Sequence, residues 1–341
     1  MTKSDTRQLK GLAILMMLWL HLFSDEETVS QCSYLLSYVN GLPLAYSLSR
    51  LASCCVPIYI FLGGYGLAAT FRTTPGNLLH GGRRALALMA NFWLVFLIFI
   101  PLGCWVNPAV YPGDLWTLLL NAMAVSYSYN GAWWFLLPYV LLTLTAQQLI
   151  SRCETSAKGR DVALLVVLAV VNIGVYLLKG ALPLTDTWPL PGVLTLLNYV
   201  SMLLLFTMGI LAVKYQWIER WRDKLLLFPA WKVAVALVVL CLLKMLLGAS
   251  SLLNVPFVVL LIPMLLALRW PQWIHRTLEF LGLHSTNMWL THYFFYYMFG
   301  NLIYGLRYPV VIFVVLTAVS LGCSLVLRPL FEPLRKRIRG N

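Results

Sequence analysis

The stretch "RQLKGLAILMMLWLHLF", Arg7 to Phe23, is an apolar run of bilayer-spanning length with a lysine near its start and a histidine near its end. A transmembrane helix needs about 20 predominantly apolar residues, with a range of about 17 to 25. Similar runs recur along a chain that is 60% hydrophobic and 11% charged, with a mean hydropathy of +0.80. Soluble domains carry about 25% charged residues, so the composition indicates a polytopic membrane protein.

Ten apolar segments have the length of membrane-spanning helices. They lie at residues 9–24, 52–71, 85–104, 131–150, 161–178, 195–213, 232–247, 252–268, 281–299 and 308–327. A further apolar piece, 115–126, is short and follows the turn sequence "YPGD", which favours a re-entrant or interfacial helix. The sequence therefore predicts an all-α fold with about ten transmembrane helices, in which residues 1–341 form a single membrane domain.

The distribution of Lys and Arg selects the topology. With the N-terminus in the cytoplasm, 21 of the 25 cations fall in cytoplasmic segments. Arg50, Lys179 and Arg307 lie outside, and Lys244 is expected to snorkel outward from its span. Counting 115–126 as a crossing would reverse every later loop and destroy this bias. The net charge of +13 is thus explained by positive-inside sorting, both termini are predicted to be cytoplasmic, and no nucleic-acid partner is expected.

The seven cysteines give no sign of a metal centre or a disulfide framework. They are scattered, mostly inside apolar runs, and no CxxC pair occurs. Such cysteines are typical of small buried hydrophobic residues, so no metal is predicted.

Lys10 and His21 are aligned on one helix face. They are eleven residues apart, which is about three turns and about 16 Å along a helix axis, with Ile14 and Met17 between them. Lys10 is therefore predicted at the cytoplasmic surface and His21 about halfway across the bilayer or slightly beyond.

A second histidine, His292, is predicted at a similar depth in the span 281–299. Ser285, Trp289 and His292 share one face of that helix at i, i+4 and i+7. His284, at the start of the same motif, is expected at the interface.

Ionisable residues inside a membrane usually face a cavity and mark a functional site. The alternative is a histidine that hydrogen-bonds between helices for packing, and for either histidine alone the two interpretations are evenly matched. The pair, with a cation below one member, favours function. No Asp or Glu lies inside a predicted span, which weakens a proton-coupled transporter and leaves the histidines without a carboxylate to orient them.

Four segments match a known family in order. In "LKGLAILMMLWLH", Lys10 and His21 match a basic residue, ten residues and a histidine, and "VPIYIFLGGYGLAATFR" is similar to "FFxxSGF/Y", with Gly63 in place of serine before Gly64 and Tyr65. "GAWWFLLPYVLLTL" contains a "WFL" motif that begins at Trp134, and "LGLHSTNMWLTHYF" is similar to "LGxxSxxxYLxH". Together these segments resemble the acyltransferase-3 family of integral membrane O-acyltransferases.

The resemblance implies an acyl-coenzyme A donor, with acetyl-CoA favoured, on the cytoplasmic side of a bacterial inner membrane. The acceptor would be a hydroxyl of an envelope glycan or a lipid-linked sugar. The donor's phosphates would be held by Lys10, Arg72, Arg83 and Arg84. Positive-inside sorting is the alternative explanation for these cations, including Arg83 and Arg84.

The resemblance also assigns chemistry to the histidines. His21 would take the proton from the attacking hydroxyl or accept the acyl group briefly, and the sequence does not choose between these routes. His292 or Ser285 would orient His21 or polarise the thioester oxygen, and packing is an equal alternative for Ser285. Trp134 and Tyr65 would contact the substrate. The glycines of "FLGGYG" are interpreted first as helix-packing residues.

Two other classes of function stay open at this point. One is a transporter of small molecules or polysaccharide, and the other is a non-catalytic scaffold in a polysaccharide assembly machine. Replacing His21 with alanine separates them, because only an enzyme would lose acyl transfer while still inserting and folding. The oligomeric state is left open.

Overall fold

The computed structural model describes residues 1–30, 32–33, 38–39, 42–73, 79–182 and 190–339. The chain divides into two compact units, which are described separately. Unit 1 comprises Met1–Tyr59 and Gln216–Leu325, and unit 2 comprises Ile60–Tyr215 and Val326–Asn341. The expectation that residues 1–341 form a single domain remains a prediction.

Unit 1 is helical apart from one short ladder, in which strands β1 (Tyr38–Val39) and β2 (Leu42–Pro43) pair antiparallel. It contains α1 (Lys3–Phe23), α2 (Glu26–Ser30), α3 (Leu44–Ala52), the start of α4 (Cys55–Thr73), α10 (Trp217–Leu225), α11 (Ala230–Leu247), α12 (Ser251–Ala267), α13 (Gln272–Met298), α14 (Gly300–Tyr304) and most of α15 (Pro309–Arg339).

In unit 2 every described secondary-structure element is a helix. The unit contains the rest of α4, α5 (Leu79–Val106), α6 (Leu115–Ala122), the 3-10 helix η1 (Gly131–Phe135), α7 (Leu136–Thr155), α8 (Lys158–Ala181), α9 (Leu190–Tyr215) and the end of α15.

Each of the ten predicted spans overlaps a helical segment of the structure over most of its length. Within the described ranges, seven helices are long and apolar enough to cross a membrane by length and composition, and α12 is a shorter apolar helix. α1 and α13 have 21 and 27 residues and are not among these seven. The chain is therefore an all-α polytopic membrane protein.

The short piece 115–126 forms α6, which has only eight residues. A helix of this length rises about 12 Å, well short of the roughly 30 Å hydrocarbon core. Asp114 caps it by accepting a hydrogen bond from the backbone N–H of Thr117 at 2.7 Å. Hydrogen bonds from Thr117 lower the pKa of this exposed carboxyl group. The structure is consistent with a segment that does not cross.

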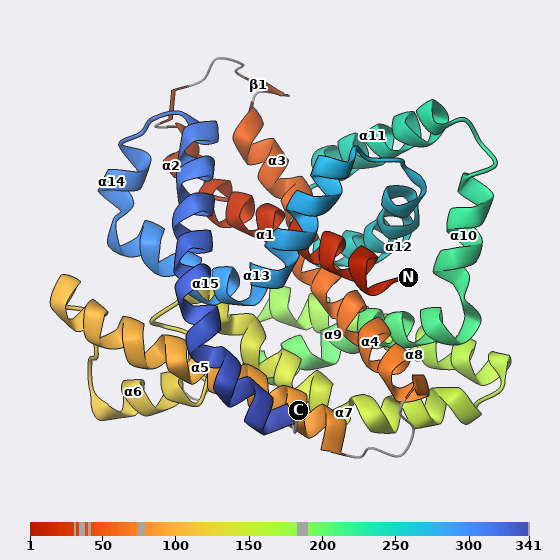
Figure 1. Ribbon diagram of the computed structural model, residues 1–341, viewed down its shortest axis with the longest axis horizontal. Helices are drawn as coiled ribbons and strands as arrows, with labels where there is room; N and C mark the ends of the chain where they lie inside the picture. Colours follow the sequence, from red (N-terminus) through yellow and green to blue (C-terminus); the bar gives the residue numbers. More distant parts are fainter. Residues whose placement is uncertain (31, 34–37, 40–41, 74–78, 183–189, 340–341) are drawn as a thin grey trace. The chain divides into compact units, whose positions relative to one another are not determined.

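In unit 1, α1 and α13 lie side by side and run in the same direction (Figure 1). Near their starts, Arg7 Nη1 lies 3.1 Å from Glu279 Oε1, and His275 Nδ1 lies 2.5 Å from Gln8 Oε1. Near their far ends, the rings of His21 and His292 are neighbours. This pairing determines the distance between the two histidines.

Two glycines let the backbones of α1 and α13 touch. A Cβ atom built on Gly11 would lie 2.0 Å from the carbonyl oxygen of Leu278, and one on Gly282 would lie 1.9 Å from that of Arg7. Real side chains do not tolerate such distances to backbone atoms, so both positions require glycine for this close approach.

In unit 2, α4 and α9 cross in the same manner. A Cβ on Gly64 would lie 2.1 Å from the carbonyl oxygen of Phe206, and one on Gly209 would lie 2.2 Å from that of Phe61. Gly63 faces the ring of Tyr139, whereas Gly66 has no neighbour within 4 Å of the added atom. The preference for a packing role of "FLGGYG" is supported at Gly63 and Gly64.

Two sequence-based placements are wrong. Lys244 is not at the surface: its side chain is buried, and Nζ donates to the carbonyl oxygen of Gly248 at 2.6 Å at the end of α11. His284 is not interfacial either. It is buried in unit 1, where its Nδ1 lies 2.9 Å from the hydroxyl of Ser324 on α15. Lys244 is satisfied by a carbonyl oxygen four residues later and His284 by a hydroxyl on another helix, and these polar partners make burial possible.

Candidate functional site

The structure brings His21 and His292 together within unit 1. Their ring centroids are 5.0 Å apart and the rings are tilted by 55°. His21 lies in the last turn of α1 and is half-buried, whereas His292 on α13 is fully buried. Tyr293 presents its ring edge-on to His21 at a centroid distance of 6.3 Å.

Backbone carbonyl groups orient the ring of His292. Its Nδ1 lies 2.8 Å from the carbonyl oxygen of Trp289 and 3.1 Å from that of Met288. Because a carbonyl oxygen only accepts, we assign the proton to Nδ1 in the neutral ring, which leaves a lone pair on Nε2. In the described part of the chain this buried Nε2 atom has no hydrogen-bond partner. The sequence offers no carboxylate to orient this ring. In the structure, backbone carbonyl groups of α13 orient it instead.

Ser285 is not brought to the histidine pair. Its hydroxyl donates to the carbonyl oxygen of Gly282 at 3.0 Å, one turn earlier on α13. Ser285 precedes His292 by seven residues, which is about 10 Å along the helix axis. A direct contact of Ser285 with His21 or with the reacting atoms therefore gains no support from its position.

Lys10 and His21 lie on one continuous helix, α1, as the spacing predicts. Ile14 and Met17, which lie between them on this face, are fully buried. Between Lys10 and His21 this face of α1 is therefore packed with apolar side chains.

Two of the predicted donor-binding arginines lie near each other in unit 2. Arg72 donates from Nε and Nη2 to the carboxylate of Glu154, at 2.9 and 3.1 Å, and from Nη1 to the carbonyl oxygen of Val213 at 2.9 Å. Arg84 donates at 3.2 Å to the hydroxyl of Thr70, which lies two residues before Arg72 near the end of α4. Each of the three nitrogens of the Arg72 guanidinium thus already donates within the protein.

Arg83, Trp134 and Tyr65 also lie in unit 2. Arg83 is half-buried at the start of α5. Trp134 is half-buried in η1, while its neighbour Trp133 is buried against Phe92 with ring centroids 4.8 Å apart. Tyr65 is buried in α4. Of the two indoles, Trp134 is the more accessible.

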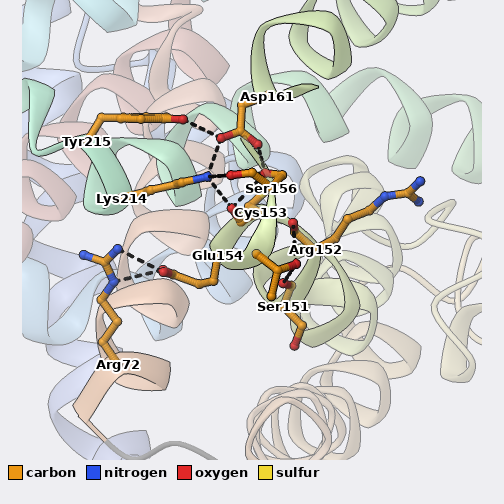
Figure 2. A network of polar contacts seen from close by, with 10 residues as sticks. Arg72, Ser151, Arg152, Cys153, Glu154, Ser156, Asp161, Lys214 and Tyr215 are labelled. Carbon is orange, nitrogen blue, oxygen red and sulfur yellow. Dashed lines mark hydrogen bonds and ion pairs between the residues drawn. The ribbon is translucent and has the colours of Figure 1, made fainter. Parts of the chain in front are cut away.

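A polar network joins the ends of α7 and α9 to the start of α8 (Figure 2). Lys214 Nζ lies 2.5 Å from the carboxylate of Asp161 and also donates to the carbonyl oxygens of Cys153 and Ser156. Tyr215 donates to the same carboxylate at 2.6 Å, and the Ser156 hydroxyl donates to its other oxygen. Sequence reasoning missed this network, because Asp161 and Lys214 are 53 residues apart and each looks like an ordinary end-of-span charge.

Asp161→Asn is expected to destabilise the protein by about 3–5 kcal/mol, since it leaves the ammonium of Lys214 with a weaker partner in a desolvated setting. The Asp161 side chain is 3% exposed. The Arg72–Glu154 pair is the matched control, with side chains 37% and 28% exposed, so Glu154→Gln should cost at most about 1 kcal/mol. Thermal unfolding of both variants in detergent measures the difference, and equal effects would contradict a structural role for the buried pair.

Among the described residues, no group of three or more His, Cys, Asp and Glu is arranged to hold a metal ion. The expectation that no metal takes part remains a prediction.

Comparison with known proteins supplies the family. The family model with the description "Acyltransferase domain" (Acyl_transf_3) matches residues 7–328. Searches of curated proteins and of solved structures give no match. The matched region covers both α1 with His21 and α13 with His292, and nearly all of the chain. The chain therefore belongs to the acyltransferase-3 family of membrane acyltransferases.

Proposed function

We propose that the protein moves an acyl group, most simply acetyl, from acyl-coenzyme A to a hydroxyl of an envelope glycan or lipid-linked sugar. The observation that carries this proposal is the pairing of His21 and His292, whose ring centroids are 5.0 Å apart in a chain of this family. Neither the pair nor the family match adds support for transport.

The chemistry follows from the tautomer assigned to His292 and from the position of His21. A neutral imidazole takes the proton of the acceptor hydroxyl as its oxygen forms a bond to the thioester carbonyl carbon. The tetrahedral intermediate then breaks its carbon–sulfur bond, and the imidazolium returns the proton to the coenzyme A thiolate. In the second route, imidazole attacks the thioester first and carries the acyl group to the hydroxyl. In both routes His21 is the reacting base or nucleophile, and the lone pair of His292 Nε2, which has no partner among the described residues, would accept a hydrogen bond from the His21 ring during the reaction.

For the membrane arrangement we propose ten spans, both termini in the cytoplasm, and a location in a bacterial inner membrane. The parallel run of α1 and α13 supports this topology. Two parallel spans must be separated by an odd number of crossings. The seven predicted spans from 52–71 to 252–268 satisfy this requirement, whereas a further crossing at 115–126 would make α1 and α13 antiparallel.

We retain Lys10, Arg83 and Arg84 as the cations proposed to bind the donor's phosphates. Arg72 is the weaker candidate, because its guanidinium already pairs with the carboxylate of Glu154. Positive side chains at the cytoplasmic surface suit the anionic phosphates of coenzyme A. Trp134 and Tyr65 remain the proposed acceptor contacts, and the half-buried Trp134 is the stronger of the two.

Two substitutions of His292 separate a base from a hydrogen-bond acceptor. A glutamine side chain can place its amide oxygen near the position of Nε2, where it accepts a hydrogen bond but takes no proton. If His292 orients His21, His292→Gln should keep about a tenth of the activity while His292→Ala loses about 100-fold or more. Acetyl-CoA turnover by both purified variants measures this, and equal losses would contradict the orienting role.

The proposed function as a whole is tested with sealed membrane vesicles of both orientations and labelled acetyl-CoA, which does not cross membranes. We expect label to enter the glycan or lipid fraction only in inside-out vesicles, which expose the cytoplasmic face. Label transfer from right-side-out vesicles, or none in either orientation despite folded protein, would refute the proposal.

A further inference from the structure

A pocket of about 400 Å³ lies where α7 ends and α8 begins, in unit 2. One part of its wall is polar and includes the guanidinium-bearing residues Arg152 and Arg160. Another part is apolar and consists of Ala163, Leu164 and Val167 on α8. The pocket thus joins a cationic rim to an apolar wall.

The neighbouring carboxylates are already neutralised by other cations. Asp161, which also lines the pocket, is held by Lys214, Tyr215 and Ser156. Glu154 is held by Arg72. Arg152 and Arg160 are exposed, and in the described part of the chain no carboxylate lies within ion-pair distance of either. Figure 2 shows Arg152 directed away from this network. The pocket therefore carries two uncompensated positive charges.

The apolar wall continues along a face of α8 that the protein leaves uncovered. Val166, Val167 and Val170 are 57%, 57% and 64% exposed, and only 11% of the most apolar stretch of α8 is buried. In a membrane protein such a face contacts acyl chains. An occupant of the pocket would thus meet guanidinium groups at one end and hydrocarbon at the other.

We propose that this pocket binds the headgroup of an anionic phospholipid, with its acyl chains along α8. Arginine binds phosphate oxygens in bidentate fashion, and the inner leaflet of a bacterial membrane is rich in anionic lipids. The proposal rests on the ten-span topology, which puts residues 151–160 on the cytoplasmic side. It does not depend on acyl transfer.

The test compares phosphatidylglycerol with phosphatidylcholine, titrated onto the purified full-length protein and followed by native mass spectrometry. The combined substitution Arg152→Gln with Arg160→Gln is expected to weaken phosphatidylglycerol binding by about 10- to 30-fold and to leave phosphatidylcholine binding unchanged. The matched control, Lys158→Gln with Arg220→Gln, removes the same two charges from exposed positions outside the pocket lining and should bind like wild type.

Glycerol 3-phosphate and coenzyme A form the soluble arms of the same experiment. If either competes with phosphatidylglycerol at equal concentration, the pocket recognises a free phosphate and the lipid assignment is overturned. The proposal is also overturned if both double variants lose phosphatidylglycerol binding to the same extent. It is overturned as well if a second copy of the chain covers α8 and replacing the two arginines leaves phosphatidylglycerol binding unchanged.

Hydrogen–deuterium exchange of wild-type protein gives a readout that needs no variant. Phosphatidylglycerol should slow exchange over residues 151–167 relative to phosphatidylcholine, and unchanged exchange there would overturn the proposal. Because no readout uses acyl transfer, failure of this inference and failure of the proposed enzymatic function are distinguishable.

Discussion

Replacing His21 with alanine is expected to lower acetyl-CoA turnover by about 10²- to 10⁴-fold while the purified protein stays folded. The physical reason is that His21 is the accessible member of the pair: it is half-buried, whereas His292 is fully buried. Loss of this imidazole removes the base or nucleophile from both routes considered above. Release of the coenzyme A thiol by variant and wild type, at equal protein concentration, gives the ratio directly.

The control is another histidine of unit 1. His275 lies in the first turn of α13 and contacts Gln8, far along the helix from His292. His275→Ala should therefore leave turnover within about twofold of wild type, since only one hydrogen bond is lost. If His275→Ala and His21→Ala reduce turnover equally, the effect of His21 is a general effect on folding and the assignment is wrong.

The second large effect is expected at the backbone contact of α1 with α13. Gly11→Ala or Gly282→Ala puts a methyl group about 2 Å from a carbonyl oxygen of the partner helix, so the helices must separate. We expect a loss of stability of at least about 1–3 kcal/mol, which is typical of overpacking. We also expect turnover to fall by about 100-fold, because a displacement of about 1 Å at the reacting groups has that effect.

Gly322→Ala is the matched substitution on the exposed side of α15 in unit 1, where an added Cβ meets no atom within 4 Å. Alanine is a better helix former than glycine, so this variant should be stabilised by about 0.5–1 kcal/mol. Gly11→Ala and Gly282→Ala should thus lower the unfolding temperature, whereas Gly322→Ala should raise it. A neutral Gly11→Ala would contradict the close approach of the helices.

The helices of this fold could be predicted because each needs only local information. A run such as residues 161–178 is apolar for the length of a bilayer crossing, and the structure has α8 there. The shared face of Lys10 and His21 also follows from helical geometry, since both lie on α1. The brevity of α6 could likewise be anticipated from the short apolar run after "YPGD".

Contacts between segments far apart in the chain could not be predicted. His284 is predicted near water because the sequence does not reveal that Ser324, 40 residues later, satisfies it. Lys244 fails for a different reason: its partner Gly248 is only four residues away, but the sequence does not show that α11 ends there with its carbonyl group turned to the lysine. The sequence predicts only that His21 and His292 lie at a similar depth, whereas their 5.0 Å separation depends on Gly11 and Gly282. Gly11 did have a signal, since small residues permit close helix packing, but nothing in the sequence identified its partner helix.

The most direct test of the account is a double-mutant cycle on the histidine pair, with acetyl-CoA turnover by the purified protein as the readout. If His21 and His292 act as one unit, the variant lacking both imidazoles should be no slower than His21→Ala alone. The account predicts this non-additive result together with folded protein in every variant. Wild-type turnover by the double variant would show that neither imidazole takes part, and strictly additive losses would show that the two do not act together.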